Sequence, residues 1–274
     1  MNLSLIISVY NSPDFLDRVL ASVLRQRLMP TEVIVTEDGN FIANQGVINQ
    51  WKKKWPQSSK LFHLTQRDDG NRKPLAMNKA VATSLGDYLV FVDGDCVLHK
   101  DFVYEHMKNS SLDSFLTGRR AELSQKATQF LTLEKISGGY LDNIPWALLY
   151  DSVFGKTFHF GRFFKTPKYL RQLLGQNNIN DIRGCNFSVH RKHLVAINGF
   201  TNDYSGAYGE DTEVEWRLRY SGLKMKSVKG AALLYHLWHP QQTKDPLNQE
   251  RLKELLSHRQ ARTSNGLNEA TKIP

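Results

Sequence analysis

The chain opens with a strand–turn–helix sequence, Leu3-Ser4-Leu5-Ile6-Ile7-Ser8-Val9-Tyr10-Asn11-Ser12-Pro13. Its first seven residues are mostly aliphatic and predict a buried strand. Ser12 can cap a helix, and Pro13 suits the first helical position. Apolar residues with helical spacing follow, namely Phe15, Leu16, Val19, Leu20, Val23 and Leu24. The segment therefore predicts a strand, a short turn and an amphipathic helix.

The same alternation continues along the next part of the chain. Three β-rich segments predict strands, Glu32–Thr36, Lys60–Thr65 and Asp87–Val92. Two helical patterns separate them, Ile42–Lys54 and Lys73–Ser84. Repeated strand–helix–strand units are typical of a parallel sheet with right-handed crossovers. We therefore predict an α/β fold with a doubly wound, mostly parallel sheet flanked by helices.

Beyond Leu98 the pattern is less regular, and we expect a helical insertion before strands return. Helices are predicted at Ala127–Lys135, Tyr169–Leu174, Asp211–Ser221 and Asn248–Ser257, and strands at Cys185–Val189 and Ala231–Leu237. The polar end of the sequence, residues 264–274, is expected to be loosely ordered.

Composition excludes several classes of protein. The 274 residues are 41% hydrophobic and 23% charged, which is ordinary for a globular protein and unlike a disordered, collagen-like or coiled-coil chain. Lys and Arg outnumber Asp and Glu by 36 to 27, which gives a formal charge of +9 and favours anionic partners.

Several features point to a reducing compartment. Cys96 and Cys185 are too few for a disulfide framework. The first residues lack the basic start and the cleavage site of a secretory signal. No stretch reaches the ~20 apolar residues needed to cross a bilayer. We therefore expect a cytoplasmic protein, with any membrane contact peripheral and at the inner face of the cytoplasmic membrane.

Acidic residues follow three of the first four predicted strands, at Glu37-Asp38, Asp68-Asp69 and Asp93-Gly94-Asp95. The carboxyl ends of parallel strands meet at one edge of a sheet, where such folds bind ligands. Clustered carboxylates repel one another unless a cation compensates them, so this edge suits Mg²⁺ or Mn²⁺ together with phosphate oxygens. Gly94 lets the chain turn so that both Asp93 and Asp95 approach one centre. Alone, however, this short motif also fits a surface turn.

Other polar residues could complete such a site. Glu210 and Asp211 open a predicted helix, where the helix dipole favours carboxylates with or without chemistry. His236 and His239 follow the last predicted strand and could be metal ligands or ordinary packed histidines. Arg72 and Lys73 could hold pyrophosphate or simply begin a solvated helix.

Together these segments resemble the family 2 glycosyltransferases, which have the glycosyltransferase A fold. The similar segments are 5–11, 32–40, 72–80, 86–96, 184–188, 198–200, 209–211 and 236–239. The resemblance spans roughly residues 3–240 and is closest to bacterial enzymes of lipopolysaccharide or capsule synthesis. It implies a catalytic domain over 1–240, with a nucleotide-binding half of about 1–98 and an acceptor-side half of about 99–240. Residues 241–274 would form a C-terminal helix and tail.

The resemblance also implies roles for individual residues. Asp211, with Glu210 beside it, would be the catalytic base, and the metal ligands would be Asp95, His236 and Asp93. The choice between His236 and His239 stays open, as does the choice between Glu37 and Asp38 for contact with the base, because Glu37 stands where the family usually has Asp. The residues expected to bind the nucleotide sugar are Tyr10, Asn11, Glu37, Asp38, Arg72, Lys73, Asn78, Asp93 and Gly94.

These residues suit transfer of a sugar from a nucleotide-diphosphate donor, expected to be a UDP-sugar, to a hydroxyl of a glycan or lipid-linked acceptor. A divalent ion stabilises charge on the leaving diphosphate, and a separate carboxylate takes the acceptor's proton on the opposite face, which gives inversion. Two alternatives remain. A nucleotidyltransferase would have a glycine-rich loop after the first strand, which is absent. A basic RNA- or membrane-binding protein would leave the acids unexplained, and we expect no nucleic-acid partner.

One basic segment, 154–171, contains several phenylalanines and no acidic residue. Its cations are Lys156, Arg162, Lys165, Lys168 and Arg171. Such a segment could rest on an anionic membrane near a lipid-linked acceptor. It could equally be an acceptor lid or ordinary packing.

Overall fold

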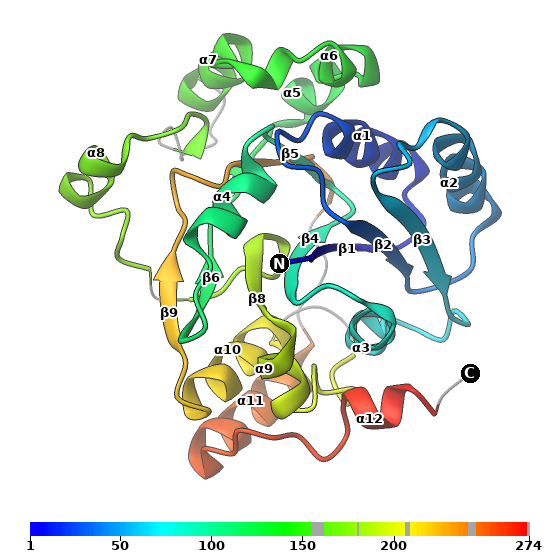
Figure 1. Cartoon of the computed structure of the whole chain (residues 1–274), viewed down its shortest axis with the longest axis vertical. Helices are drawn as coiled ribbons and strands as arrows, with labels where there is room; N and C mark the ends of the chain where they lie inside the picture. The colour runs from blue at the N-terminus through cyan, green and yellow to red at the C-terminus, as the bar shows by residue number, and fades with distance from the viewer. Residues whose placement is uncertain (155–161, 180, 206–208, 241–244, 273–274) are drawn as a thin grey trace.

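The structure, a computed structural model, describes residues 1–154, 162–179, 181–205, 209–240 and 245–272 (Figure 1). Its main sheet has seven strands in the order β3-β2-β1-β4-β8-β6-β9. These strands are β1 (Leu3–Val9), β2 (Glu32–Glu37), β3 (Lys60–Thr65), β4 (Tyr88–Asp93), β6 (Ser114–Thr117), β8 (Phe187–His190) and β9 (Lys224–Ser227). The four strands predicted from the beginning of the chain are confirmed to within one residue.

Helices cover both faces of this sheet (Figure 1). One buried cluster contains the apolar sides of α1 and α2, and a second, on the other face, contains those of α3, α9 and α10. The helices are α1 (Pro13–Leu24), α2 (Ile42–Lys54), α3 (Lys73–Thr83), α4 (Phe102–Asn109), α5 (Gln125–Phe130), α6 (Leu133–Ser137), α7 (Trp146–Phe154), α8 (Lys168–Leu173), α9 (Arg191–Ala196), α10 (Glu210–Tyr220), α11 (Pro246–His258) and α12 (Leu267–Ala270), with short 3₁₀ turns at η1 (Tyr140–Asp142) and η3 (Gly184–Asn186). The predicted α/β architecture is therefore confirmed.

Strand register brings the polar strand ends together. Strands β3, β2, β1 and β4 run parallel, and Ser8 near the end of β1 pairs with Thr36 on one side and Asp93 on the other. The turns that follow these strands consequently share one edge of the sheet. Strand β8 runs antiparallel to both β4 and β6 and joins the two parallel groups.

A second, three-stranded sheet completes this edge. Its strands are β5 (Cys96–Leu98), β10 (Leu234–His236) and β7 (Ala121–Glu122), in the order β5-β10-β7. Residue His236 pairs with Cys96 on one side and with Glu122 on the other. Segments more than a hundred residues apart thereby deliver His236 and Glu122 beside the turn that carries Asp95.

The strands expected at Cys185–Val189 and Ala231–Leu237 begin later in the structure, as β8 and β10. Two further expectations differ from the structure in kind. The helix expected at Ala127–Lys135 is two helices, α5 and α6, because Thr132 caps the second and its hydroxyl accepts a hydrogen bond from the backbone of Lys135. The end expected to be loosely ordered contains α12, which packs on α3. The side chain of Leu267 is only 6% exposed there, so this short apolar element outweighs the polar residues around it.

A buried histidine on α4 lies against β8 and the turn before it. Residue His106 has no exposed surface, and its Nδ1 and Nε2 lie 2.7 Å from Oγ of Ser188 and 3.0 Å from Oδ1 of Asn186. Asn186 donates its own amide to backbone oxygens, so Nε2 of His106 is the donor in their pair and the imidazole is neutral. Burial lowers the pKa of His106 to about 4.

This histidine is expected to make the fold sensitive to acid. The unfolded chain takes up a proton near pH 6.5 and the folded chain only near pH 4, so stability is lost as the pH falls between these values. The free energy of unfolding should fall by about 2 kcal/mol from pH 7 to pH 5 through this residue alone. Urea unfolding of a His106→Gln variant should show a flatter pH dependence, whereas a variant of the exposed His258, His258→Gln, should keep the wild-type slope. Equal slopes in all three proteins would contradict the assignment.

Candidate functional site

Three potential metal ligands converge after β4 and β10. Asp95, His236 and His239 each offer an atom within 4.8 Å of the other two. Oδ2 of Asp95 lies 3.4 Å from Nε2 of His236 and 3.1 Å from Nε2 of His239. One carboxylate oxygen and two imidazole nitrogens suit Mn²⁺ and related divalent ions, so the residues fit the ion that the sequence predicts. The sequence left the choice between the two histidines open, and the structure brings both to Asp95.

Electrostatics set the charges in this cluster. Burial opposes ionisation of Asp95, but hydrogen bonds with the two histidines hold the pKa of Asp95 well below its usual range. Burial likewise opposes protonation of His236, yet its bonds with Asp95 and Glu122 raise the pKa of His236 to about 10. A cation binding through His236 would therefore displace a proton.

Glu122 is a site residue that sequence analysis missed. Its Oε2 lies 2.7 Å from Nδ1 of His236, and its Oε1 accepts a hydrogen bond of 2.6 Å from Nε of Arg120. A carboxylate on one ring nitrogen fixes the imidazole so that the other nitrogen faces the metal position. The sequence carried no local signal for this role, because only the pairing of β7 with β10 brings the two residues together.

Glu122 is therefore expected to hold His236 in place for metal binding. A Glu122→Gln variant should bind Mn²⁺ about 10–100-fold more weakly, because the amide orients the ring less firmly. Calorimetry with MnCl₂ measures the change, and Glu134→Gln, at an exposed acid of α6, is the matched control. An affinity within about twofold of wild type would exclude this role for Glu122.

A partly buried lysine connects Asp93, at the end of β4, to the acids of α10. Nζ of Lys73 lies 2.9 Å from Oδ1 of Asp93 and 3.6 Å from Oε1 of Glu210. Although burial opposes it, Asp93, Asp211 and Glu210 together raise the pKa of Lys73 above its ordinary value. Burial, and next the neighbouring Asp211, raise the pKa of Glu210 to about 7. The structure thus places Asp93, Lys73, Glu210 and Asp211 around one centre.

Asp211 lies at the start of α10, where a glycine makes room for it. Its Oδ2 accepts a hydrogen bond of 2.9 Å from the backbone N–H of Gly184. A Cβ atom on Gly184 would come within 2.1 Å of Oδ1 of Asp211, so only glycine allows this approach. Gly209, the N-cap of α10, has φ of 106° and also requires glycine. These two glycines fix where the carboxylate of Asp211 points.

The acid that ends β2 and the acid that follows it have different surroundings. Glu37 is completely buried, and its oxygens accept from the backbone of Phe41 and pair with Nε2 of His63. Both carboxylate oxygens of Glu37 are therefore engaged within the fold, and its role in donor binding stays a prediction. Asp38 is 5% exposed and accepts from Nε2 of Gln66 and from the backbone N–H of Arg72. It ties the start of α3 to this edge of the sheet.

The other residues expected to bind the donor fall into two groups. Tyr10 and Asn11 are exposed beside the site, and Tyr10 donates to Asp68. Gly94 packs against the end of β1 and donates its N–H to the backbone of Ser8. Asn78 does not belong to the site: its side chain is fully buried and exchanges hydrogen bonds with the backbone of Phe200. Its amide holds α3 to the segment before α10 instead.

Acidic side chains from another part of the chain contact the basic segment 154–171. Lys165 pairs with both Asp101 and Glu105, which belong to α4 and the turn before it. Arg162 donates to the backbone of Arg120. Only Lys168 and Arg171 of the expected cations lie on α8, and Lys156 lies outside the described residues. No helix among the described residues has the length and apolar content needed to cross a membrane.

Comparisons of the sequence with known proteins point to one family. The model of glycosyl transferase family 2 matches residues 4–196, and that of the N-terminal domain of galactosyltransferase matches residues 168–240. The hyaluronan synthase of Pasteurella multocida is 25% identical over 248 residues, which cover 86% of this chain and 24% of that protein. The poly(ribitol-phosphate) beta-glucosyltransferase of Bacillus spizizenii is 33% identical over 98 residues, or 35% of this chain and 15% of that one. This chain thus spans a quarter or less of either relative.

Solved structures show the same fold. TarS 1-349 of S. aureus in complex with UDP-GlcNAc superimposes with a TM-score of 0.61 at 14% identity, covering 100% of this chain and 70% of that one. The mannosyltransferase of Pyrobaculum calidifontis in complex with GDP-Man and Mn²⁺ has a TM-score of 0.56 at 13% identity, covering 94% of this chain and 69% of that one. These are glycosyltransferase A folds, as the sequence predicts. With its family match over residues 4–196, the chain belongs to glycosyl transferase family 2.

Proposed function

We propose that this chain is an inverting, metal-dependent transferase that moves a sugar from a UDP-sugar to a hydroxyl of a glycan or lipid-linked acceptor. One observation carries the proposal. Acidic groups form two separate sets, Asp95 with its histidines and Glu210 with Asp211. Lys73 lies between Asp93 and Glu210. Inverting transfer requires such a division, with one group at the leaving diphosphate and another at the attacking hydroxyl.

The chain's own residues would share the work as follows. Asp95, His236 and His239 would hold Mn²⁺ or Mg²⁺, which when bound supplies positive charge to the diphosphate. Lys73 can exchange its contact with Asp93 for a diphosphate oxygen, because its ammonium already lies at this edge. Asp38 would contact the uracil ring, and Asp93 the ribose. Asp211, held by the N–H of Gly184, would accept the proton of the acceptor hydroxyl.

Release of UDP tests this function directly. The purified chain should liberate UDP from a UDP-sugar in the presence of Mn²⁺ or Mg²⁺ and lose this activity in EDTA. A panel of nucleotide sugars, first compared by thermal shift with Mn²⁺, identifies the donor, because a ligand at ~100 times its Kd adds about 2.7 kcal/mol of stability. Absence of UDP release with every donor and of any ligand-induced stabilisation would contradict the proposal.

The acceptor class rests on the relatives. Hyaluronan synthase of Pasteurella multocida and chondroitin synthase of Escherichia coli, which is 24% identical over 243 residues, are named for the polysaccharides they make. We propose a related role for this chain in bacterial surface glycans, including lipopolysaccharide or capsule, at the cytoplasmic side of the inner membrane.

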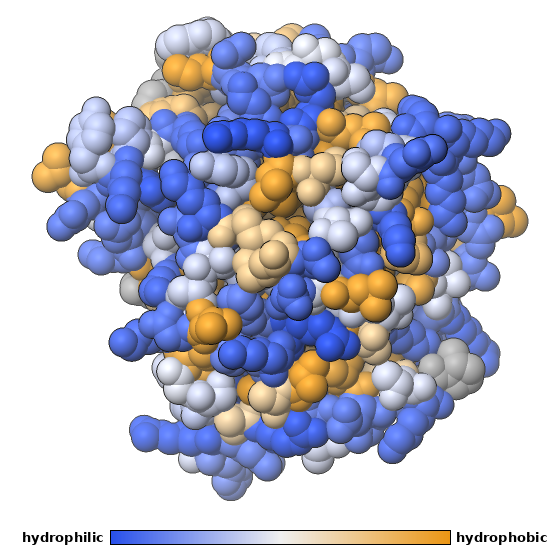
Figure 2. Space-filling view, viewed as in Figure 1, coloured by the Kyte–Doolittle hydropathy of each residue, from blue (hydrophilic) through white to orange (hydrophobic). Residues whose placement is uncertain are grey.

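We further propose that α8 contacts an anionic membrane. Tyr169 and Leu173 are 71% and 80% exposed, and Leu174, the residue after α8, is also exposed. Lys168 and Arg171 lie on the same short helix, which projects from the body of the molecule (Figure 1). Exposed apolar residues beside cations suit an acidic lipid surface. Elsewhere on the face seen in Figure 2, hydrophilic residues predominate and apolar ones form separate patches.

Removal of this basic charge should weaken vesicle binding. Each cation near an acidic leaflet contributes about 1 kcal/mol, so a Lys168→Ser/Arg171→Ser variant should bind about 30-fold more weakly. Sedimentation with phosphatidylserine-containing vesicles measures the change, and Lys52→Ser/Lys53→Ser, at the end of α2, is the matched loss of two charges. Equal sedimentation of all three proteins would rule this contact out.

A further inference from the structure

Positively charged residues gather at the half of the sheet edge formed by β8, β6 and β9. Strand β8 pairs antiparallel with both β4 and β6, and β9 pairs parallel with β6, so β6 and β9 end at the edge where β4 ends. The beginning of β8 lies there too. The cations at these strand ends are Arg119 and Arg120 after β6, Arg183 shortly before β8 and Lys229 after β9. The proposed reaction uses none of them.

Arg162 of the basic segment joins this group. Its Nη1 donates a hydrogen bond of 3.3 Å to the backbone oxygen of Arg120. Nε of Arg120 donates to Glu122 at 2.6 Å, and Glu122 is the carboxylate that orients His236. The group therefore borders the metal cluster. We refer to its members as the cation cluster, namely Arg119, Arg120, Arg162, Arg183 and Lys229.

The cation cluster also borders the proposed base. The backbone N–H of Arg183 donates a hydrogen bond of 3.2 Å to Oγ1 of Thr117, the last residue of β6. The next residue, Gly184, donates its N–H to Asp211 at 2.9 Å. An anion bound by Arg183 would therefore lie close to the carboxylate that would take the acceptor's proton.

Acidic partners are too few for these cations. Asp181 is shared, because its two oxygens pair with Arg119 and, at 3.2 Å, with Arg183. Arg162 and Lys229 form no ion pair within the part of the chain that the structure describes. The remaining residues include no Asp or Glu that could supply one. Positive charge therefore stays uncompensated at this half of the edge.

The cations act on one another and can be reached from solvent. Burial, and next the charges of Arg119 and Arg183, lower the pKa of Arg162 below its ordinary value. Burial, and next Arg162 and Arg119, likewise lower the pKa of Lys229. An anion bound among these like charges would relieve their repulsion. The side chain of Arg183 is 53% exposed, and Arg162 and Lys229 are half-buried, so a ligand has access to them.

The number of available charges indicates which anion fits. One arginine satisfies a carboxylate, because two parallel N–H groups bind its two oxygens. A phosphate group carries about 1.5–2 negative charges and has three acceptor oxygens, so it can bind several cations at once. The planar guanidinium of arginine matches phosphate geometry with donors in a fixed fork. Two cations without an ion pair and two that share one acid therefore suit a phosphate group better than a carboxylate.

We propose that Arg162, Arg183 and Lys229 bind a phosphate group of the acceptor and thereby place its hydroxyl near Asp211. The phosphate belongs either to the diphosphate of a lipid carrier or to a phosphorylated glycan, and the chemistry of recognition is the same for both. The donor diphosphate is assigned above to the metal cluster and Lys73. That the phosphate is part of the acceptor rests on the proposed function, whereas the binding of phosphate does not.

Binding of phosphate compounds in EDTA, without donor, tests the site. Calorimetry should show that glucose 1-phosphate and farnesyl diphosphate bind and that neutral glucose does not. Arg162→Gln/Lys229→Gln should weaken this binding about 10–100-fold, the usual contribution of a hydrogen bond between charged groups, and should reduce its salt dependence.

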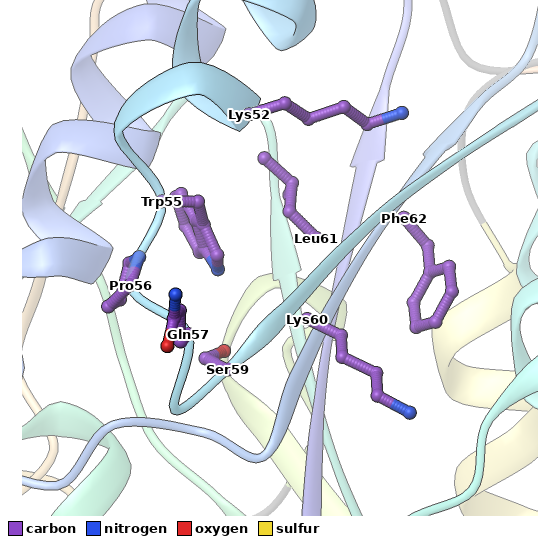
Figure 3. Close-up of a pocket in the computed structure, with 8 residues that line it drawn as sticks. All are labelled: Lys52, Trp55, Pro56, Gln57, Ser59, Lys60, Leu61 and Phe62. Carbon is purple, nitrogen blue, oxygen red and sulfur yellow. The ribbon is translucent and has the colours of Figure 1, made fainter.

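Two lysines far from the cation cluster provide the matched control. Lys52 and Lys60 are exposed and line a hollow of about 340 Å³ between the end of α2 and the beginning of β3 (Figure 3). Lys60 pairs with Glu32 at the beginning of β2, so this hollow lies near the amino ends of the strands. Lys52→Gln/Lys60→Gln removes two positive charges and should bind both phosphate compounds as wild type does.

The order of affinities identifies the source of the phosphate. Tighter binding of farnesyl diphosphate than of glucose 1-phosphate would support a lipid carrier, and the reverse order would support a phosphorylated glycan. Inorganic phosphate bound as tightly as either compound would make this a site for the free ion and would overturn the acceptor assignment. Glucuronate bound as tightly as glucose 1-phosphate would overturn the choice of phosphate over carboxylate.

The variants decide where the phosphate binds. Equal affinities in wild type and Arg162→Gln/Lys229→Gln would place it elsewhere. UDP affinity with Mn²⁺ should be unchanged in this variant, and its loss would assign these cations to the donor diphosphate instead. Arg183→Gln, at a more exposed side chain, replaces the double variant if that protein has a lowered Tm. Because metal and donor are absent from the binding experiment, its failure leaves UDP release untouched, and failure of UDP release leaves phosphate binding intact.

Discussion

Replacement of Asp95 by asparagine is expected to abolish Mn²⁺-dependent binding of UDP. Asp95 is the carboxylate that both His236 and His239 approach, at 3.4 and 3.1 Å. Its low pKa keeps it charged, whereas an amide offers a divalent ion no charge. The loss of metal affinity should be larger than the loss expected for Glu122→Gln, which is about 10–100-fold, because Glu122 only orients a metal ligand.

Calorimetry of UDP with and without Mn²⁺ measures this effect. The Asp95→Asn variant keeps the size of the side chain but removes the charge that pairs with the two histidines, so its Tm should fall. The effect on the metal site is therefore read from UDP affinity with and without Mn²⁺ on the same folded preparation. Asp113→Asn, at an exposed acid paired with Lys226, is the matched control and should bind UDP with Mn²⁺ as wild type does. Unchanged UDP affinity in Asp95→Asn would show that Asp95 is not a metal ligand. The proposed metal site would then consist of the two histidines alone.

Strand ends were the predictable part of this site. Short apolar strands and helical spacing are local signals, and parallel strands bring their carboxyl ends to one edge whatever the details of packing. This is why Asp93 and Asp95 could be placed at this edge from the sequence. They were expected at one metal centre, but the cluster of potential metal ligands among the described residues contains Asp95 and not Asp93, which pairs with Lys73 instead. Asp211 was placed by resemblance to the family. The need for glycine at position 184 depends on the tertiary contact, because a Cβ there would clash with the carboxylate of Asp211.

Residues whose role depends on tertiary pairing could not be assigned in this way. Glu122 reaches His236 only because β7 pairs with β10, although several helices and strands separate the two in the chain. Asn78 and Glu37 have residue types suited to ligand binding, but burial commits their polar atoms to Phe200, Phe41 and His63. A sequence motif specifies which side chain is present and cannot specify whether that side chain faces the cleft or the core.

The largest effect on turnover is expected from Asp211→Asn. An asparagine oxygen can still accept the hydrogen bond from Gly184, so the local structure should persist, but the amide cannot take the acceptor's proton. Turnover should fall by roughly 10²–10⁴, the usual contribution of a positioned general base. UDP affinity should stay the same, because Asp38, Asp95 and His236 are unaltered. A purely electrostatic role at the helix N-terminus would cost at most ~1 kcal/mol of stability and little activity.

The neighbouring Glu210 makes a matched comparison necessary. Burial, and next the neighbouring Asp211, raise the pKa of Glu210 to about 7. A carboxyl group with this pKa is also suitable as a general base near neutral pH. A base must be deprotonated, so activity that depended on Glu210 would be lost as the pH falls below about 7. If Asp211 is the base, Glu210→Gln should retain much more turnover than Asp211→Asn.

The two variants therefore separate the candidate bases by kinetics and by pH profile. A loss of about 10²-fold or more in Glu210→Gln, with Asp211→Asn within about threefold of wild type, would assign the base to Glu210. Melting temperature and UDP affinity, measured on the same preparations, distinguish either result from a folding defect. If both variants kept turnover within about threefold, neither acid would be the base. The proposal of inverting transfer through the acids of α10 would then be wrong, whereas membership of the family, which rests on the match over residues 4–196, would stand.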